Sequence, residues 1–310
     1  MKSLQIQAAD AVMMVRPVSF GFNEQTASSN AFQVRPEDQQ NITQKGLKEF
    51  DDLKKLLSQH GVNVITINDT APPTKPDAVF CNNWISFHHD GTVILYPMLA
   101  PNRRLERRLE VLEEINHQQF KIDRLLDYSK FEETDKFLES TGSMVIDYVN
   151  KIIYACISPR TDPEVLQIVA NQLSMDTETC TAVDKNGMEI YHTNVLMNIG
   201  HQFTVICDIA IKDRKERNKV LDRLSLTGHE VISLSYEQMY AFAGNMLQLR
   251  SQSGQSLLVM STTAYQSLLP DQIEKIEKYT TILKAHIPTI DQYGGGSVRC
   301  MLGNIHLPRF

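Results

Sequence analysis

Cys300 is the residue of this sequence whose surroundings most favour chemistry. It closely follows Gly294, Gly295 and Gly296, and glycines let the backbone approach a ligand more closely than side chains allow. A thiol placed just past such a loop can be presented to a small molecule. It becomes a nucleophile when a neighbouring imidazole or cation lowers its pKa. Taken alone, Cys300 better fits a half-buried cysteine of the last strand.

Two further residues could work with this thiol. His192, in YHTNVLMNIG, stands at the threshold of an apolar strand, and Glu139, in FLESTGSMVID, precedes a glycine turn and another apolar strand. Read singly, they fit a structural histidine and a solvated loop acid. Together, a thiolate, an imidazole and a carboxylate are the groups needed to attack an electrophilic carbon and expel an amine. We therefore predict that Cys300, His192 and Glu139 meet in one pocket.

A recurring unit of two strands and an amphipathic helix must position these residues. Runs rich in Val, Ile, Phe and Tyr, bounded by Gly, Asn and Asp, indicate strands, and apolar residues at three-to-four spacing indicate helices. The copies cover 77–115, 142–173, 193–224 and 244–279, with a fifth divided between 294–302 and 11–60. A repeat of roughly 50 to 65 residues predicts a closed ring of five units. Simple alternation of strands and helices in an α/β sandwich would give a similar pattern.

In such a ring the polar residues that open each unit would converge on the axis. The residues at these positions are Asn82, Asn83, Glu139, His192, Asn194, Asn245 and the segment GGGSVRC. The ring therefore predicts a central polar pocket.

Motifs along the whole chain resemble one superfamily. MVRPVSFGFNEQT, DAVFCNNW, LESTGSMVID, SPRTD, the His192 segment and GGGSVRCML are similar to the penteins, which comprise arginine deiminases, dimethylarginine hydrolases, succinylarginine dihydrolase and amidinotransferases. The sequence most resembles the branch of citrulline-utilisation hydrolases, also called amidinotransferase-like. The resemblance implies an α/β fold over residues 1–310, a single catalytic domain built as a five-bladed propeller of ββαβ repeats around a central active site.

The resemblance also implies roles for individual residues. Cys300 would be the nucleophile, His192 the general acid and base, and Glu139 the carboxylate that orients a substrate nitrogen. Arg160, in SPRTD, would hold the α-carboxylate of the substrate, because a guanidinium fork suits a bidentate grip on a carboxylate. Arg16 and Asn23 are further expected pocket residues. No metal and no organic cofactor is required for this chemistry.

Asn83 and Asn194 stand where arginine deiminases carry acidic residues. A carboxylate pairs well with a guanidinium, whereas an asparagine offers both a donor and an acceptor, which matches a neutral ureido group. This favours a ureido amino acid, with citrulline converted to ornithine, ammonia and carbon dioxide. Two alternatives remain. One is a guanidine-modifying enzyme, such as an arginine deiminase, a dimethylarginine hydrolase or an amidinotransferase; the other is a pentein that binds without catalysis.

Composition restricts partners and location. The 310 residues are 42% hydrophobic and carry a net charge of -6, which argues against a general nucleic-acid binder. We interpret Arg103, Arg104, Arg107 and Arg108, mixed with glutamates, as one solvated helix face with ion pairs. The chain lacks a membrane-spanning run and a signal peptide, and its five scattered cysteines fit neither disulfides nor zinc, so we expect a cytoplasmic protein. Its partner would be a small amino acid, and a homodimer is one option for its assembly.

Overall fold

Five units of strand, strand, helix and strand build the chain, as the spacing of its apolar segments predicts. We describe them from a computed structural model covering residues 6–37 and 41–310. The first four units follow one another along the chain. The first consists of β3 (Ile85–Phe87), β4 (Thr92–Leu95), α3 (Glu110–His117) and β5 (Arg124–Asp127), and the second of β6 (Met144–Asp147), β7 (Ile152–Cys156), α5 (Pro163–Leu173) and β8 (Asp176–Cys180). The third consists of β9 (Met197–Ile199), β10 (Phe203–Ile206), α7 (Arg214–Leu226) and β11 (Glu230–Ser233), and the fourth of β12 (Leu247–Arg250), β13 (Ser256–Ser261), α10 (Pro270–Glu277) and β14 (Thr281–Ala285).

The fifth unit joins the two ends of the chain, again as predicted. It consists of β15 (Gly303–Ile305), β1 (Ala11–Arg16), α1 (Ile42–Gln59) and β2 (Asn63–Asn68). Antiparallel pairing of β15 with β1 ties the C-terminal segment to the N-terminal strand. The segment that carries Cys300 is therefore held inside the fold.

Each unit has the same internal pairing. Its first two strands are antiparallel, and its third strand returns parallel to the second after the helix. A parallel return needs a long crossover, which the helix supplies. Three units form separate three-stranded sheets, and the fifth and first units join through β15 and β3 into one six-stranded sheet. The fold is thus an α/β propeller of ββαβ blades, and we number the blades one to five in the order given above.

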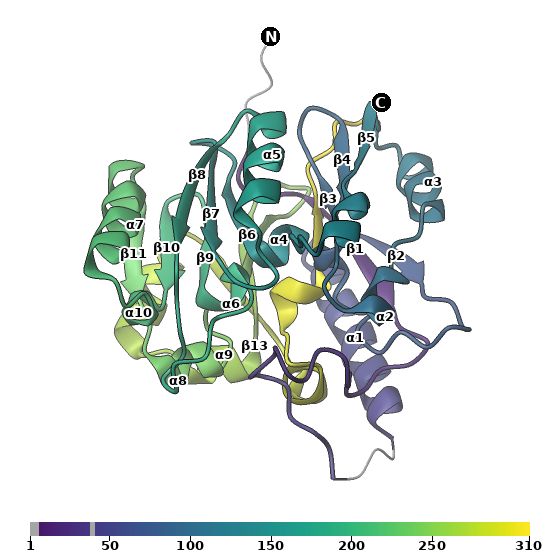
Figure 1. Cartoon of the computed structure of the whole chain (residues 1–310), viewed down its shortest axis with the longest axis horizontal. Helices are drawn as coiled ribbons and strands as arrows, with labels where there is room; N and C mark the ends of the chain where they lie inside the picture. Colours follow the sequence, from purple (N-terminus) through teal and green to yellow (C-terminus); the bar gives the residue numbers. More distant parts are fainter. Residues whose placement is uncertain (1–5, 38–40) are drawn as a thin grey trace.

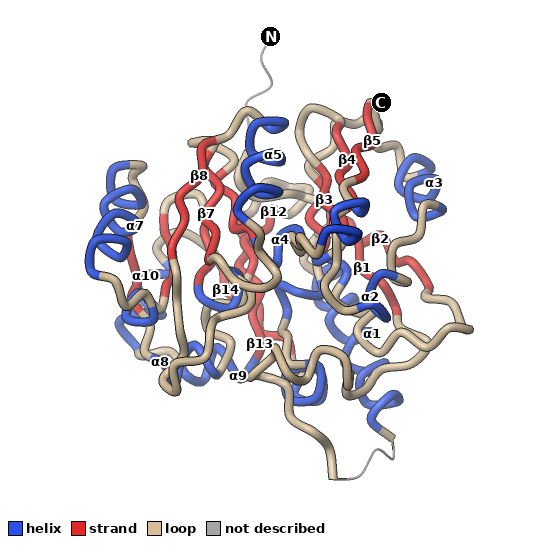
Figure 2. Tube along the Cα trace, in the orientation of Figure 1, coloured by secondary structure: helices blue, strands red, loops and turns tan. Residues whose placement is uncertain are grey.

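Helix positions follow from local signals. Asp162 caps α5 by accepting hydrogen bonds from the backbone N–H groups of Glu164 and Val165, and Asp213 caps α7 in the same way. The apolar face of α5 is buried. Figure 1 and Figure 2 show helices such as α1, α3 and α7 toward the periphery of the molecule and strands further inward. No helix among the described residues is long and apolar enough to cross a membrane.

Short helices connect the longer elements. They are α2 (Pro101–Arg104), α4 (Ser140–Ser143), α6 (Thr193–Leu196), α8 (Tyr236–Tyr240) and α9 (Thr262–Ser267). Three single turns lie at Cys81–Asn83, Ile290–Gly294 and Val298–Met301. Because α4, α6 and the turns at Cys81–Asn83 and Val298–Met301 precede first strands of blades, they place polar residues at the blade starts.

Candidate active site

A buried cavity lies at the blade starts, where the ring was expected to gather polar residues. Cys300, His192, Asn83 and Arg160 are among its lining residues, and its volume is about 10 Å³. This space is too small for an amino acid. A substrate amino acid can therefore bind here only if part of the cavity wall moves.

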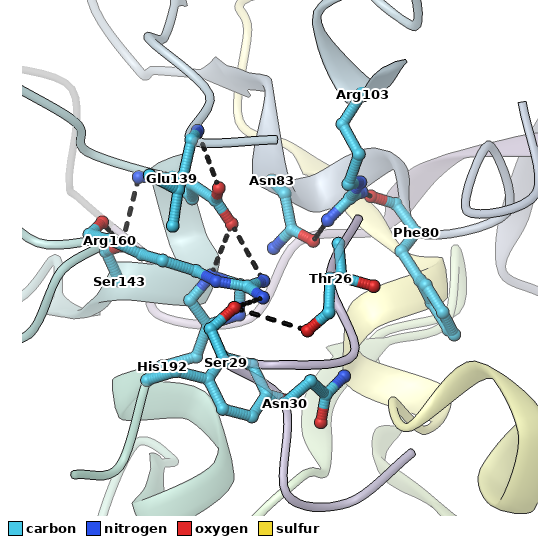
Figure 3. Close-up of polar contacts among 12 residues, drawn as sticks. Thr26, Ser29, Asn30, Phe80, Asn83, Arg103, Glu139, Ser143, Arg160 and His192 are labelled. Atoms are coloured by element: carbon cyan, nitrogen blue, oxygen red, sulfur yellow. Dashed lines mark hydrogen bonds and ion pairs between the residues drawn. The ribbon is translucent and has the colours of Figure 1, made fainter. Parts of the chain in front are cut away.

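His192 and Glu139 form a hydrogen-bonded pair in this region (Figure 3). Each directly precedes a short helix, α6 and α4 respectively. His192 Nε2 lies 2.7 Å from Glu139 Oε2, and both side chains are almost wholly buried. A carboxylate oxygen only accepts, so Nε2 carries the proton and Nδ1 keeps its lone pair when the ring is neutral. The pair thus leaves Nδ1 able to take up a proton.

The charges of this pair follow from burial and neighbours. Burial lowers the pKa of His192 to about 4, although Glu139 raises it. Burial raises the pKa of Glu139, but Arg160 and His192 outweigh this effect and leave that pKa well below its usual value. At neutral pH the pair is therefore a neutral imidazole beside a carboxylate.

Arg160 is buried at the same place. Its Nη1 lies 3.4 Å from Glu139 Oε2, its Nη2 donates to Ser29 Oγ at 2.6 Å, and its guanidinium stacks over the Tyr191 ring at 4.7 Å. Arg160 Nε has no hydrogen-bond partner among the described residues. This cation therefore has donor capacity left for an anionic group.

Cys300 lies in the turn Val298–Met301, just before β15, and is buried. Two side-chain amides donate to its sulfur: Asn245 Nδ2 at 3.3 Å and Asn194 Nδ2 at 3.5 Å. Burial raises the pKa of the Cys300 thiol, while the hydrogen bond from Asn245 is the largest of the effects that lower it. Asn194 thus faces the sulfur, and we had expected it beside the substrate.

Asn83 has a fixed orientation. Arg103 Nη1 donates to Asn83 Oδ1 at 2.9 Å, so the amide nitrogen must point away from Arg103. A Cβ placed on Gly142 would lie 2.3 Å from Asn83 Nδ2 and 2.9 Å from His192 Nδ1, so Gly142 keeps this space free. Asn83 Nδ2 has no acceptor among the described residues. The cavity therefore holds one unpaired amide donor close to the imidazole.

Arg103 corrects our interpretation of the arginine cluster. Arg103 is not on a solvated helix face. It is buried, donates to Glu106 through two bonds of 3.0 and 2.9 Å, and lines the cavity. Glu106 is buried as well, and burial raises its pKa to about 7. The expected helix over 105–115 begins only at Glu110, because α2 ends at Arg104 and the chain turns between them.

Asp77 is a second cavity residue that the sequence analysis did not single out. Asn23 Nδ2 donates to Asp77 Oδ2 at 2.7 Å, and Asp77 Oδ1 has no partner among the described residues. Burial raises the pKa of Asp77, while Arg103 and Asn23 lower it. Asn23 thus supports the cavity wall through Asp77. The position of Asp77 at the opening of the first repeat was the available signal.

Arg16 does not line the cavity. It ends β1 and forms a bidentate ion pair with Asp51 of α1 at 2.8 and 2.7 Å, with 38% of its side chain exposed. The expectation that Arg16 is a pocket residue is wrong, because the end of β1 meets α1 and not the axis.

One wall of the cavity comes from the loop after β1. Ser29 accepts from Arg160, and Asn30 Nδ2 donates to Gly295 O at 3.1 Å (Figure 3 shows both residues). Gly295 has a φ of 62°, which favours glycine, and a Cβ there would meet Gln33 at 2.7 Å. The loop is therefore held to the glycine segment and to Arg160 by a few polar contacts.

Comparison with protein families decides what kind of protein has this site. A family model described as "N,N dimethylarginine dimethylhydrolase, eukaryotic" matches residues 16–307. The chain belongs to this family. It is thus a pentein hydrolase of the group that modifies guanidino groups. This match does not show the citrulline-utilisation branch that the sequence most resembles, so that finer assignment stays a proposal. No curated protein sequence matches the chain.

Solved structures share the fold. Apo ArgZ, an arginine dihydrolase from the ornithine-ammonia cycle in cyanobacteria, has a TM-score of 0.73 at 14% identity, over 97% of this chain and 41% of ArgZ. The chain therefore spans about two fifths of that protein, and it covers 99% of the ArgZ N-terminal domain bound to product, with a TM-score of 0.69 at 14% identity. A dimethylarginine dimethylhydrolase mutant (DDAH) from Pseudomonas aeruginosa, complexed with citrulline, has a TM-score of 0.64 at 14% identity, over 98% of this chain and 100% of that one.

Proposed function

We propose that this protein hydrolyses the guanidino group of an arginine-like amino acid, with Cys300 as the nucleophile. The observation that carries the proposal is the buried His192–Glu139 pair beside a cavity that Cys300 also lines. Membership of the dimethylarginine dimethylhydrolase family supports a guanidino substrate. Glu139 and Asp77 support it too, because carboxylates accept hydrogen bonds from a guanidinium.

The proposed reaction runs in two stages. His192 Nδ1 takes the thiol proton of Cys300, and the sulfur bonds to the guanidino carbon; the bond from that carbon to the leaving nitrogen then breaks, and this nitrogen takes the proton from His192 Nδ1 and departs as ammonia or a methylated amine. Water then adds to the same carbon and gives a proton to His192 Nδ1. The S–C bond breaks, and the sulfur takes that proton back. The net change is guanidino compound plus water to ureido compound plus amine. Glu139 keeps the imidazole oriented throughout.

Arg160 would hold the α-carboxylate of the substrate. In this structure its Nη2 donates to Ser29 Oγ. The loop carrying Ser29 and Asn30 would have to move for an amino acid to enter, and this would free Arg160 for a carboxylate. A carboxylate is a stronger acceptor for a guanidinium than a hydroxyl is.

A ureido substrate such as citrulline is the second candidate, favoured by Asn83. Its Nδ2 donor faces the space beside His192 and Gly142. A guanidinium has only donors and offers nothing to this N–H, whereas a ureido oxygen would accept from it. Asn194 in place of an acid also suits a neutral group. Hydrolysis of citrulline by the same cysteine chemistry would give ornithine, ammonia and carbon dioxide.

A substrate panel separates the two candidates. Purified protein is incubated with arginine, with Nω,Nω-dimethylarginine and with citrulline, and citrulline, ornithine, ammonia and dimethylamine are measured. The guanidino proposal predicts citrulline from at least one of the first two substrates. Turnover of citrulline alone would replace it with the ureido candidate. Equal rates for wild type and Cys300→Ala on every substrate would favour a binding protein without catalysis.

A matched pair of variants tests the role of Asn83. Asn83→Asp exchanges the donor for a carboxylate and should raise the arginine-to-citrulline ratio of kcat/KM by about tenfold or more. Asn82→Asp is the control, since Asn82 neighbours Asn83, is equally buried and bonds Thr141 outside the cavity lining. A ratio that moves equally in both variants would contradict a direct role of Asn83.

A further inference from the structure

The sulfur of Cys300 has an unusual set of polar neighbours for a nucleophilic thiol. Two side-chain amides, those of Asn245 and Asn194, donate to the sulfur, and a backbone hydrogen bond from Ser297 also lowers the pKa of the thiol. The imidazole N–H of His192 is directed to Glu139 and not to the sulfur. Neutral donors from blades three and four therefore surround this thiol.

The neighbouring Arg299 does not supply a cation to the sulfur through a hydrogen bond either. Its guanidinium donates to Leu302 O at 2.7 Å and to Asn304 Oδ1 at 3.1 Å. Its charge still lowers the pKa of the Cys300 thiol, but less than the hydrogen bond from Asn245 does. The shorter of the two amide hydrogen bonds to the sulfur is thus the one from Asn245.

The orientation of Asn245 is fixed by its other contacts. The backbone N–H of Arg299 donates to Asn245 Oδ1 at 3.1 Å, and Asn245 Nδ2 donates to the backbone oxygen of Asn194 at 3.0 Å. A backbone N–H can only donate and a carbonyl can only accept, so the amide cannot be turned round. Asn245 is fully buried. Its second Nδ2 proton is consequently held toward the sulfur.

The preceding residue explains how Asn245 reaches this place. A Cβ on Gly244 would lie only 2.3 Å from the backbone oxygen of Val195. Glycine at 244 therefore lets the start of blade four approach blade three closely. This brings Asn245 within reach of both Asn194 and Cys300.

We propose that Asn245 is a catalytic residue whose Nδ2–H stabilises the thiolate of Cys300. The inference rests on the proposed function, in which Cys300 is the nucleophile. The hydrogen bond is strongest while the sulfur is negative, since charged acceptors bind donors more tightly than neutral ones. It stabilises the thiolate before its sulfur bonds to the substrate carbon. It acts again when the S–C bond breaks and the electron pair returns to the sulfur.

Alkylation of Cys300 tests this proposal without any substrate. The rate of modification by iodoacetamide is measured against pH by intact mass, with Cys300→Ser giving the background from other thiols. Asn245→Leu keeps a similar volume and removes the donor. It should move the midpoint of the profile up by about one pH unit and slow alkylation at pH 7 about tenfold. An unchanged midpoint in a folded Asn245→Leu protein would overturn the proposal.

A second variant at position 245 tests the proposal even if Asn245→Leu does not fold. Asn245→Asp keeps an oxygen for the N–H of Arg299 but turns a carboxylate toward the sulfur. It should move the midpoint further upward than Asn245→Leu does. A wild-type midpoint in this variant would show that side chain 245 does not face the sulfur, which also overturns the proposal.

Asn198 provides the matched control. It is a buried asparagine whose Oδ1 also accepts from a backbone N–H, that of Val205, at 3.2 Å, but it does not contact Cys300. Asn198→Leu and Asn198→Asp should leave the midpoint within about 0.2 pH units of wild type. Equal shifts at 198 and 245 would show a general effect of losing a buried amide and would contradict the inference. Failure of every substrate would refute the proposed function without changing this result.

Discussion

The two sides of the candidate site differ in charge. Blades one and two contribute charged residues that form two ion pairs, Arg103 with Asp77 and Arg160 with Glu139. Blades three, four and five contribute the neutral amides of Asn194 and Asn245 and the thiol of Cys300. We call these the charged side and the neutral side. His192, from blade three, connects them through Glu139.

This difference in charge suggests that the two sides have different roles in the reaction. A buried charge is stable only when it is paired, so substitution of either partner disrupts a pair. Such pairs can orient a polar substrate and shift the pKa of an imidazole. On the neutral side, burial raises the pKa of the Cys300 thiol, and two amide side chains donate to its sulfur. Substitutions on the two sides should therefore change different steps of the reaction.

The largest effect is expected on the neutral side, at the nucleophile. Cys300→Ser should lower kcat by at least about a thousandfold, because a serine hydroxyl is far harder to ionise than a thiol. Steady-state assays on the best substrate of the panel measure this. Cys207→Ala is the control, since Cys207 is a buried core thiol, and it should stay within about twofold of wild type. Comparable losses in both variants would contradict the assignment.

On the charged side, Glu139→Gln should lower kcat about a hundredfold or more, since the imidazole loses its orienting carboxylate. The pH profile adds a sharper test. The base must be neutral, so kcat/KM should fall only as the pH drops through the His192 pKa of about 4. Glu139 raises that pKa, so Glu139→Gln should move the acid limb to lower pH. An acid limb near pH 6.5 in wild type would contradict the buried, neutral imidazole.

Arg160→Gln should act mainly on binding. It should raise KM for an amino acid substrate by about tenfold or more, because a charge-assisted pair with the α-carboxylate is lost. A decarboxylated analogue such as agmatine should show a much smaller difference between variant and wild type. An equal rise in KM for the amino acid and for agmatine would show that Arg160 acts through Glu139 alone.

Arg16→Ala should have the smallest effect. The pair with Asp51 is partly exposed, and exposed ion pairs contribute about 0.2–1 kcal/mol to stability. Activity should stay within about twofold of wild type, and the free energy of unfolding in urea should fall by less than about 1 kcal/mol. A large loss of activity in Arg16→Ala would show that Arg16 does contribute to the active site.

The sequence predicted the features that depend on local patterns. Alternating apolar runs and helical spacing indicated the five units, including the one divided between the termini. Cys300, His192 and Glu139 were found because each stands at the opening of a unit, where strands meet the axis. Family resemblance then separated them from the structural roles that each residue type fills more often.

Features that depend on packing could not be predicted. Arg103 was taken as solvated because its glutamate neighbours match ion pairs along a helix, yet the break after α2 turns it inward. Arg16 was taken as a pocket residue because it lies in a motif, although its strand ends against α1. The amide orientations of Asn83 and Asn245 follow from partners at residues 103 and 299, and no sequence pattern encodes such contacts.

The most direct test of the central claim is the intact mass of the acid-quenched protein during turnover. We predict a covalent increment equal to the substrate less the amine it releases, located by peptide mapping at Cys300. It should be present in wild type, form more slowly in His192→Gln, which lacks the proton donor for the leaving nitrogen, and be absent from Cys300→Ser. An increment on another residue, or turnover without any adduct in wild type and His192→Gln, would contradict the account.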